Sequence, residues 1–429
     1  MAQMRMMKQD AGAEVETGHP GLAVHRLVLS YFRNYQNARL ELPEGFMGPV
    51  VLIGQNGSGK TNLLEALSFL MPGRGMRSAK LSDVCHIGAA MPWAVAARVQ
   101  GRSDEAQLGT GLDARTMAAI REKQAETSPD DDDNGFDSDS ETLSERRVVK
   151  INGEAASGPA ALSDHMSVTW VTPRMDRLFL EGASVRRRFF DRIVSGLHGD
   201  HNRHLNAYEK AMRERMRLIS DRYKQPDTAW VSALERRAAA EAVIIVANRL
   251  DALAHLRGQI DDHGTGPFPK ADLALDGVLE AALSSKPALE VEELFRQILA
   301  DNRGRDGASG RAHDGPHKSD FTAFHVAKEM PARMCSTGEQ KALVLGIVLA
   351  AARMERALEG HAPIILLDEV AAHLDQERRA ALFDELQELG SQVWLTGTEA
   401  ALFSPLQGKA AMFNVCNGEI SPIAGNLEE

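Results

Sequence analysis

The 429-residue sequence is poor in the features that mark secreted or membrane proteins. Its three cysteines, Cys85, Cys335 and Cys416, lie far apart, which excludes a disulfide framework and a cysteine-rich metal site. No stretch approaches about 18 uninterrupted apolar residues, and the N-terminus has no apolar core of a signal peptide. We therefore expect no membrane partner, and a reducing cytoplasm is the expected compartment.

A basic surplus, typical of general nucleic-acid binders, is also lacking, because the formal net charge is −11. Residues 126–141 alone carry eight acids and no bases, so one segment accounts for most of that charge. The composition of this segment favours a solvated linker over a protein-binding tail, and we expect disorder over about 122–146. The argument against nucleic-acid binding is weak once this segment is set aside.

Hydrophobic patterning predicts an α/β fold that is interrupted by helices. Short strand-like runs alternate with helices on both sides of the range 196–298, which instead holds long amphipathic helices. Two of these helices, broken near 225–227, suggest an antiparallel hairpin that projects from the core. The expected domains are a flexible tail over 1–22, an α/β domain formed by 23–195 and 301–429, and an α-helical arm lobe over 196–300.

A glycine-rich loop lies between a buried strand at 49–54 and a helix. Its residues match the phosphate-loop pattern G-x(4)-G-K-[ST]. Backbone N–H groups of such a loop point at phosphate oxygens, Lys60 would reach the β- and γ-phosphates of ATP, and the Thr61 hydroxyl would bind Mg²⁺. The predicted nucleotide-binding residues are Gly54, Gln55, Asn56, Gly57, Ser58, Gly59, Lys60, Thr61, Asn62 and Asp368.

Two adjacent acids, Asp368 and Glu369, end the apolar run IILL. An acid at that place can hold Mg²⁺ beside a phosphate loop, so Thr61 and Asp368 are the predicted metal residues. The neighbouring Glu369 is placed to polarise an attacking water, as a catalytic base. A pair of acids that merely caps a strand is the alternative.

Ser336 and Gly338 stand at the predicted start of a long apolar helix. Ser336 with Glu339 three residues later reads as a capping box, which needs no function. A helix start with free N–H groups can also bind phosphate, so both residues are candidates for a catalytic role. The order of phosphate loop, distant S-x-G-E/Q segment and D-E strand end resembles ABC-type ATPases, in which this signature completes the nucleotide site of another subunit.

The sequence departs from two ABC-type groups. Transporter ATPases have a shorter gap before the signature and a histidine after the last core strand, where this chain has Gly397. Zinc-hook repair ATPases need a CxxC motif, which is absent. Asp375 occupies the position of the D-loop acid, whereas no Q-loop glutamine is evident and Asp176 is only a candidate sensor.

Seven ordered segments resemble the RecF family of bacterial recombination mediators, in its alphaproteobacterial branch. They are FRNY (32–35), GQNGSGKTNLLEAL (54–67), VRRRFFD (185–191), GPHKSD (315–320), CSTGEQKALVLG (335–346), LLDEVAAHLD (366–375) and QVWLTGT (392–398). The resemblance implies an ABC-type ATPase head with mixed sheets, split by the arm lobe. It also implies a weak, DNA-stimulated ATPase that dimerises on ATP.

The same resemblance implies a role at single-strand gaps in DNA, in replication restart and SOS induction. RecO, RecR and RecA would be partners, and the protein would be cytoplasmic and nucleoid-associated. The alternatives are a soluble ABC-type ATPase coupled to a membrane or nucleoprotein partner, and a nucleotide-gated scaffold with vestigial hydrolysis. His317, in GPHKSD, is more simply a structural turn residue than a sensor.

Basic residues offer DNA contacts through the phosphate backbone. An equally plausible role for the arginines of VRRRFFD is ion pairing within the head, and the arm helix at 205–223 reads as a salt-paired solvated helix. The candidate DNA-binding residues are Arg74, Arg77, Lys80, Arg186, Arg187 and Arg188.

Overall fold

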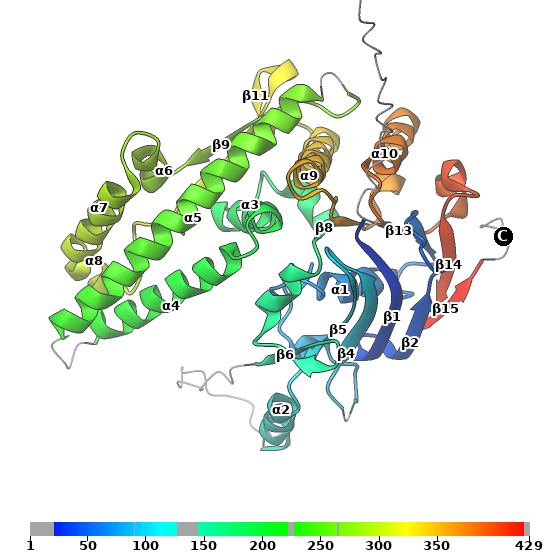
Figure 1. Ribbon diagram of the computed structural model, residues 1–429, viewed down its shortest axis with the longest axis horizontal. Helices are drawn as coiled ribbons and strands as arrows, with labels where there is room; N and C mark the ends of the chain where they lie inside the picture. The colour runs from blue at the N-terminus through cyan, green and yellow to red at the C-terminus, as the bar shows by residue number, and fades with distance from the viewer. Residues whose placement is uncertain (1–20, 90, 127–144, 222–226, 264–265, 424–429) are drawn as a thin grey trace, which may run out of the picture.

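The computed structural model describes residues 21–89, 91–126, 145–221, 227–263 and 266–423. Figure 1 shows a head rich in β-structure beside an arm of long helices. Nearly all of the expected tail over 1–22, and most of the acidic segment, lie outside the described residues. No helix within the described ranges is long and apolar enough to cross a membrane.

A mixed six-stranded sheet forms the centre of the head, in the order β15-β14-β3-β13-β12-β8. All neighbours in it are parallel except β15, which pairs antiparallel with β14. Both faces of its parallel strands are covered, which explains the continuous apolar runs predicted as buried strands. The strands are β3 (Val50–Ile53), β8 (Val168–Val171), β12 (Ile364–Leu367), β13 (Val393–Gly397), β14 (Ala411–Cys416) and β15 (Glu419–Pro422).

An antiparallel sheet in the order β2-β1-β4-β5-β6-β7 lies on one side, with helix α1 (Lys60–Ser68) in the core between the two sheets. The predicted turn at Asn152 and Gly153 joins β6 to β7, and both residues have the positive φ that this turn requires. The strands are β1 (Ala23–Phe32), β2 (Tyr35–Glu41), β4 (Ala94–Gln100), β5 (Glu105–Leu112), β6 (Arg147–Ile151) and β7 (Glu154–Ala155).

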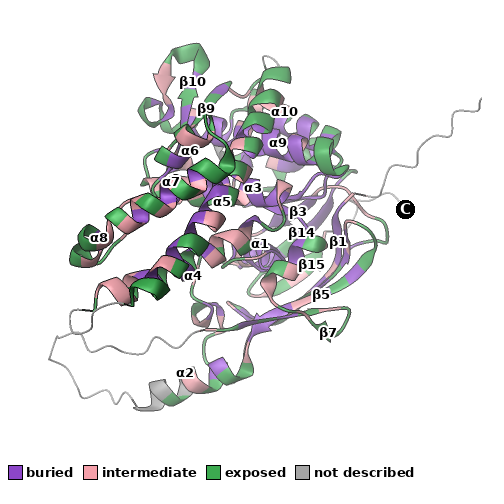
Figure 2. Ribbon diagram, turned by 60° about the vertical axis from the view of Figure 1, so that its left-hand side comes forward, coloured by how far each residue is buried: buried purple, intermediate pink, exposed green. Residues whose placement is uncertain are grey.

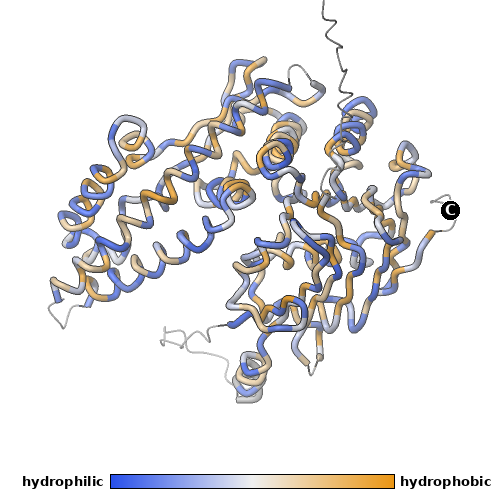
Figure 3. Tube along the Cα trace, in the orientation of Figure 1, coloured by the Kyte–Doolittle hydropathy of each residue, from blue (hydrophilic) through white to orange (hydrophobic). Residues whose placement is uncertain are grey.

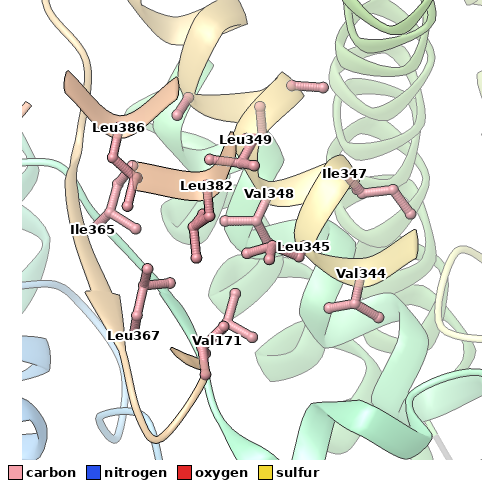
Figure 4. Packing of buried hydrophobic residues seen from close by; sticks show 14 of the residues in the cluster. Val171, Val344, Leu345, Ile347, Val348, Leu349, Ile365, Leu367, Leu382 and Leu386 are labelled. Carbon is pink, nitrogen blue, oxygen red and sulfur yellow. The ribbon is translucent and has the colours of Figure 1, made fainter. Parts of the chain in front are cut away.

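Helices α3 (Ala183–Leu197), α9 (Thr337–Glu359) and α10 (Gln376–Leu389) cover the opposite face of the mixed sheet. Figure 4 shows Leu345 and Leu349 of α9, and Leu382 of α10, beside Ile365 and Leu367 of β12. The middle of α9, between Gln340 and Glu355, is buried at nearly every position, whereas both ends of the helix are exposed. This middle part therefore reads as an apolar run rather than as an amphipathic helix, and Figure 2 shows it largely in purple.

The arm is built on the predicted hairpin of α4 (His201–Ile219) and α5 (Thr228–Asp262), with α6 (Val278–Leu283), α7 (Ala288–Asp301) and α8 (Arg303–Ser309) packed beside it. Figure 3 shows apolar and polar residues alternating along these helices. Arg215 of α4 is fully buried and pairs with Glu235 of α5 and Asp306 of α8. The arm is therefore held together by charge as well as by its apolar core.

Three details differ from the sequence-based expectations. The expected helical range contains strand β9 (Ala271–Asp276), which pairs with β10 (Asp320–His325), itself paired with β11 (Met330–Pro331). Residues 303–320, rich in glycine, histidine and aspartate, are predicted from the sequence to form a loop, yet 303–309 form helix α8, whose Asp306 pairs with the buried Arg215. Helix α2 (Ala114–Glu126) continues into the segment expected to be disordered, whereas residues 127–144 lie outside the described part.

Short 3₁₀ turns connect the larger elements. They are η1 (Ser82–Val84), η2 (Pro159–Asp164), η3 (Pro173–Arg177), η4 (Val326–Lys328), η5 (Ala332–Met334), η6 (Ala371–His373) and η7 (Ala400–Leu406).

Arg249 of α5 connects the motifs VRRRFFD and GPHKSD where the arm leaves the head. Asp191 accepts two hydrogen bonds from Arg249 of α5, at 2.7 and 2.9 Å, and Arg249 also donates to the Pro316 carbonyl oxygen. Burial alone would raise the pKa of Asp191, but Arg249 and His201 hold it below its ordinary value. His317 accepts or donates a hydrogen bond at 2.7 Å with Tyr208, so it has the structural contacts expected of a turn residue.

Glu355 of α9 provides a pH-dependent contribution to stability. Burial raises its pKa to about 7, from an ordinary 4.5, although Ser167 and Arg102 favour the charged form. Because the folded protein keeps a proton that the unfolded chain releases, this contribution is full below pH 4.5 and is lost as the pH rises through 7.

We expect Glu355→Gln to raise the free energy of unfolding at pH 8.5 by up to about 3 kcal/mol relative to the unaltered protein, with little change at pH 4.5. Urea unfolding at the two pH values measures this difference. The control is Glu359→Gln, which alters an exposed acid that also pairs with Arg102. An equal effect of both substitutions at both pH values would contradict the assignment to Glu355.

Candidate functional site

The glycine-rich loop connects β3 to α1 at the carboxyl edge of the mixed sheet. A side chain at Gly54 would lie 2.2 Å from the Val415 carbonyl oxygen, and one at Gly59 would lie 2.5 Å from the Tyr35 hydroxyl oxygen. Gly59 also has a φ of 115°, which other residues rarely adopt. The neighbouring elements thus require glycine at both positions, and the loop can stay close to β14 and Tyr35.

Lys60 is the buried cation of this loop. Its side-chain ammonium donates hydrogen bonds to the carbonyl oxygens of Gly54, at 2.6 Å, and Gln55, at 2.8 Å. Burial lowers the pKa of Lys60, while the carboxylates of Glu369 and Asp368 oppose that shift. A cation held at the start of a helix, with free N–H groups around it, is suited to bind a phosphate chain.

The Asp368 carboxylate joins the ends of β12 and β13 to the start of α1. The hydroxyl groups of Thr61 and Thr396 both donate to its Oδ1 atom at 2.9 Å, although Thr61 and Asp368 are 307 residues apart. Burial raises the pKa of Asp368, and these two hydrogen bonds oppose the shift. A hydroxyl and a carboxylate are the oxygen ligands that Mg²⁺ prefers, so the paired side chains fit the predicted metal site.

Glu369 has an unusual backbone conformation directly after Asp368. Its φ of 55° lies in the left-handed region, and its N–H group donates to the Thr396 hydroxyl at 2.8 Å. A non-glycine residue held in this region costs about 1–3 kcal/mol and tends to occur at functional sites. The geometry therefore agrees with a special task for Glu369.

Arg33, Arg77 and Glu65 form an ion-pair cluster beside the loop, a role that the sequence did not predict for any of them. The fully buried carboxylate of Glu65, on α1, accepts two hydrogen bonds from Arg33 and one from Arg77. Arg77 also donates to the Asn62 side chain at 2.8 Å. The sequence does contain a sign of this cluster: Glu65 stands among the apolar residues of NLLEAL, and a charge on a buried helix face needs a partner of opposite charge.

The FRNY segment contacts the loop from the side. The Asn34 amide donates to the Ser58 carbonyl oxygen at 3.2 Å and accepts a hydrogen bond from Asn62 at 2.6 Å. The turn 31–34 and the phosphate loop are thus one connected polar structure.

Ser336 and Gly338 are exposed at the N-terminus of α9. The predicted capping box is present, with the Ser336 N–H donating to the Glu339 carboxylate at 2.9 Å. Within the described residues, no hydrogen bond or ion pair joins Ser336 or Gly338 to residues 54–61 of the same chain. The structure therefore does not bring these two candidates to the phosphate loop of their own subunit.

Other candidates have separate contacts. Asp375 caps α10 by accepting from the Arg378 N–H at 2.8 Å, and Asp176 of η3 pairs at 3.5 Å with the buried Lys341 of α9. The pKa of Lys341 is lowered by burial and raised by the Asp176 and Glu369 carboxylates, so its charge lies within reach of both. Asp176 thus contacts the signature helix α9 through Lys341.

The six candidate DNA-binding residues do not form one cluster. Arg186 pairs with Asp320 at 2.7 Å and Arg187 donates to the Ser319 carbonyl oxygen, so both guanidinium groups have partners inside the fold. A cleft of about 550 Å³ separates the loop after α1 from α3 and α4. Arg74, Arg77 and Arg188 line this cleft, together with Arg174 and Arg192. Lys80 is exposed but is not part of its wall.

Comparison with known proteins gives consistent matches. The family described as the RecF/RecN/SMC N-terminal domain matches residues 23–421. A DNA replication and repair protein RecF from Mesorhizobium japonicum is 44% identical over 400 residues, covering 93% of this chain and 97% of that protein. RecF from Brucella suis is also 44% identical, over 416 residues that cover 96% of this chain and all of that protein.

The fold also resembles solved structures. The structure of the recombination mediator RecF with ATP in the RecFOR pathway has a TM-score of 0.77 at 20% identity, covering 95% of this chain and 100% of that one. An SMC head domain from Pyrococcus furiosus has a TM-score of 0.50 at 16% identity, covering 94% and 96%. These likenesses confirm the predicted ABC-type ATPase head.

We expect Glu65→Gln to lower the free energy of unfolding by about 2 to 3 kcal/mol, because Arg33 and Arg77 lose the carboxylate that compensates their partial burial. The control is Glu41→Gln, whose partners Arg26 and Arg39 are largely exposed, and we expect little change there. Urea unfolding compares the two. Equal losses would show that the buried pairs contribute no more than surface pairs.

Proposed function

The chain belongs to the RecF family, within the RecF/RecN/SMC group, and we propose that it is an ATP-dependent DNA-binding protein of single-strand gap repair. The observation that carries the proposal is the joining of Thr61 to Asp368 beside Lys60. The Lys60 ammonium and the Thr61 hydroxyl meet the Asp368 carboxylate, which comes from a distant segment of the chain, at one edge of the sheet. The ATP in the related RecF structure supports ATP as the nucleotide.

In this proposal the loop from Gly54 to Thr61, followed by Asn62, binds the phosphates of ATP. Lys60 would leave its carbonyl partners for phosphate oxygens, and Thr61 and Asp368 would hold Mg²⁺. Magnesium, when bound, would neutralise charge on the β- and γ-phosphates. The Thr396 hydroxyl orients the Asp368 carboxylate, and the support from Glu65, Arg33 and Arg77 fixes the start of α1.

Hydrolysis would then need two further groups. Glu369 would accept a proton from the attacking water, as a general base positioned by its strained turn. Ser336 and Gly338 would cover the γ-phosphate of the partner subunit, because they are exposed and have no contact with their own loop. In this proposal ATP acts as a dimerisation switch with slow hydrolysis: bound nucleotide would close two subunits, and its loss would separate them.

DNA binding is proposed for the basic cleft, where Arg74, Arg174 and Arg188 are exposed. Phosphate contacts by these guanidinium groups would recognise backbone and shape rather than sequence. Arg186 and Arg187 are weaker candidates, because their hydrogen bonds hold β10 and the segment before it.

We base the proposed biological role on the RecF family. RecO and RecR are proposed partners, supported by the RecFOR pathway named for the related structure. RecA loading, replication restart and SOS induction at single-strand gaps, in the cytoplasm beside the nucleoid, are the finer parts of the proposal.

The catalytic assignment predicts that Glu369→Gln lowers ATP hydrolysis at least about 100-fold, since general-base catalysis contributes that much or more. The variant should still bind ATP and dimerise, because the substitution leaves Lys60, Thr61 and Asp368 intact. Steady-state hydrolysis and sedimentation measure the two effects, with the exposed Glu399→Gln as control. Hydrolysis at the unaltered rate would show that Glu369 is not the base.

The DNA assignment predicts that Arg74→Ala combined with Arg188→Ala weakens binding of gapped duplex DNA about tenfold at moderate salt. The slope of log affinity against log salt should fall by about one for each lost phosphate contact. The matched control is Arg39→Ala, an exposed arginine on β2 outside the cleft. Unchanged affinity and slope would remove the cleft from the DNA path.

A further inference from the structure

A hollow lined by apolar and charged side chains lies directly beside the signature segment. It has a volume of about 870 Å³ and lies on the outer face of the β9–β10–β11 sheet. Phe324 of β10, Leu180 of the segment before α3 and Met334 of η5 line it, and they are 38%, 58% and 69% exposed. Three large apolar side chains thus share one solvent-facing depression.

The hollow is fixed relative to the signature by the chain itself. Met334 ends η5, and Ser336, the N-cap of α9, follows two residues later. The wall also contains the Arg186–Asp320 pair, which ties α3 to β10. Any protein subunit that covers Ser336 and Gly338 would therefore come close to Met334.

An exposed isoleucine lies on the loop after η1, which is hydrogen-bonded to the FRNY turn. Ile87 is 93% exposed, although the short loop that carries it is well anchored. The His86 N–H donates to the Tyr31 carbonyl oxygen, and the Arg33 N–H donates to that of Val84, both at 2.8 Å. Because Asn34 of the same turn bonds to Ser58, Ile87 projects from a surface that flanks the phosphate loop.

A single exposed apolar side chain is ordinary, but here two apolar features flank the two halves of one composite site. In a two-fold symmetric dimer, a contact from residue i to residue j is repeated from j to i. If the signature of one subunit covers the phosphate loop of the other, the surfaces next to these two motifs also face each other.

We propose that Ile87 of one subunit inserts into the hollow formed by Leu180, Phe324 and Met334 of a second copy of this chain. This inference rests on the proposed function, because it assumes the nucleotide-dependent dimer. The contact occurs twice and buries apolar surface at both edges of the interface. It therefore contributes to dimer affinity without touching the nucleotide.

The test measures dimerisation of the full chain by sedimentation equilibrium, with Mg²⁺ and a slowly hydrolysed ATP analogue. We expect Ile87→Asp to weaken the dimer about tenfold or more, since a desolvated carboxylate would replace a buried isoleucine near Glu181 and Asp272 of the hollow. Nucleotide affinity of the monomer should stay within about twofold. Leu289→Asp, on the outer arm helix α7 and 80% exposed, is the matched control.

A charge-rescue experiment tests whether Ile87 and Met334 contact each other directly. We expect Met334→Lys alone to weaken the dimer, and Ile87→Asp together with Met334→Lys to recover most of the affinity, because opposite charges would then meet at both copies of the contact. Dimerisation of both single variants at the unaltered affinity would overturn the contact and leave the proposed function standing. Failure of the unaltered protein to dimerise with nucleotide would overturn the switch itself.

Discussion

The hydrogen bonds at Asp368 are the interaction on which the head depends. Thr61 follows β3, Thr396 belongs to β13 and Asp368 follows β12, and these three strands are neighbours in the parallel sheet. One buried carboxylate therefore ties the phosphate loop, the strained turn at Glu369 and the last core strand to one another. A shift of any of these strands would separate the groups that bind phosphate from those proposed to act on water.

Much of the head could be predicted from the sequence, because its strands are short apolar runs that end in functional residues. The phosphate loop, the D-E strand end and the capped signature helix were each recognisable from residue type and spacing. What could not be predicted is what holds them: Glu65 with Arg33 and Arg77 involves pairs 32 and 12 residues apart in the chain. Thr396 is polar in an apolar strand, but only the fold shows that its partner is Asp368.

The arm was harder to predict for physical reasons. Strand β9 alternates apolar and polar residues over only six positions, between the long α5 and the short α6, and its partner β10 lies far along the chain. Helix α8 has little intrinsic tendency to form and depends on the buried charge of Arg215. Arg186 and Arg187 look like a DNA-binding cluster in sequence, yet their fixed partners on GPHKSD make them part of the joint between arm and head.

The central claim is that two subunits complete each nucleotide site and that DNA favours this union. The most direct measurement is ATP hydrolysis by the purified chain over a range of protein concentrations, with and without gapped duplex DNA. The account predicts a slow rate that rises more than linearly with protein and increases when DNA is added. A rate that is linear in protein and indifferent to DNA would contradict it, because one subunit would then hold a complete site.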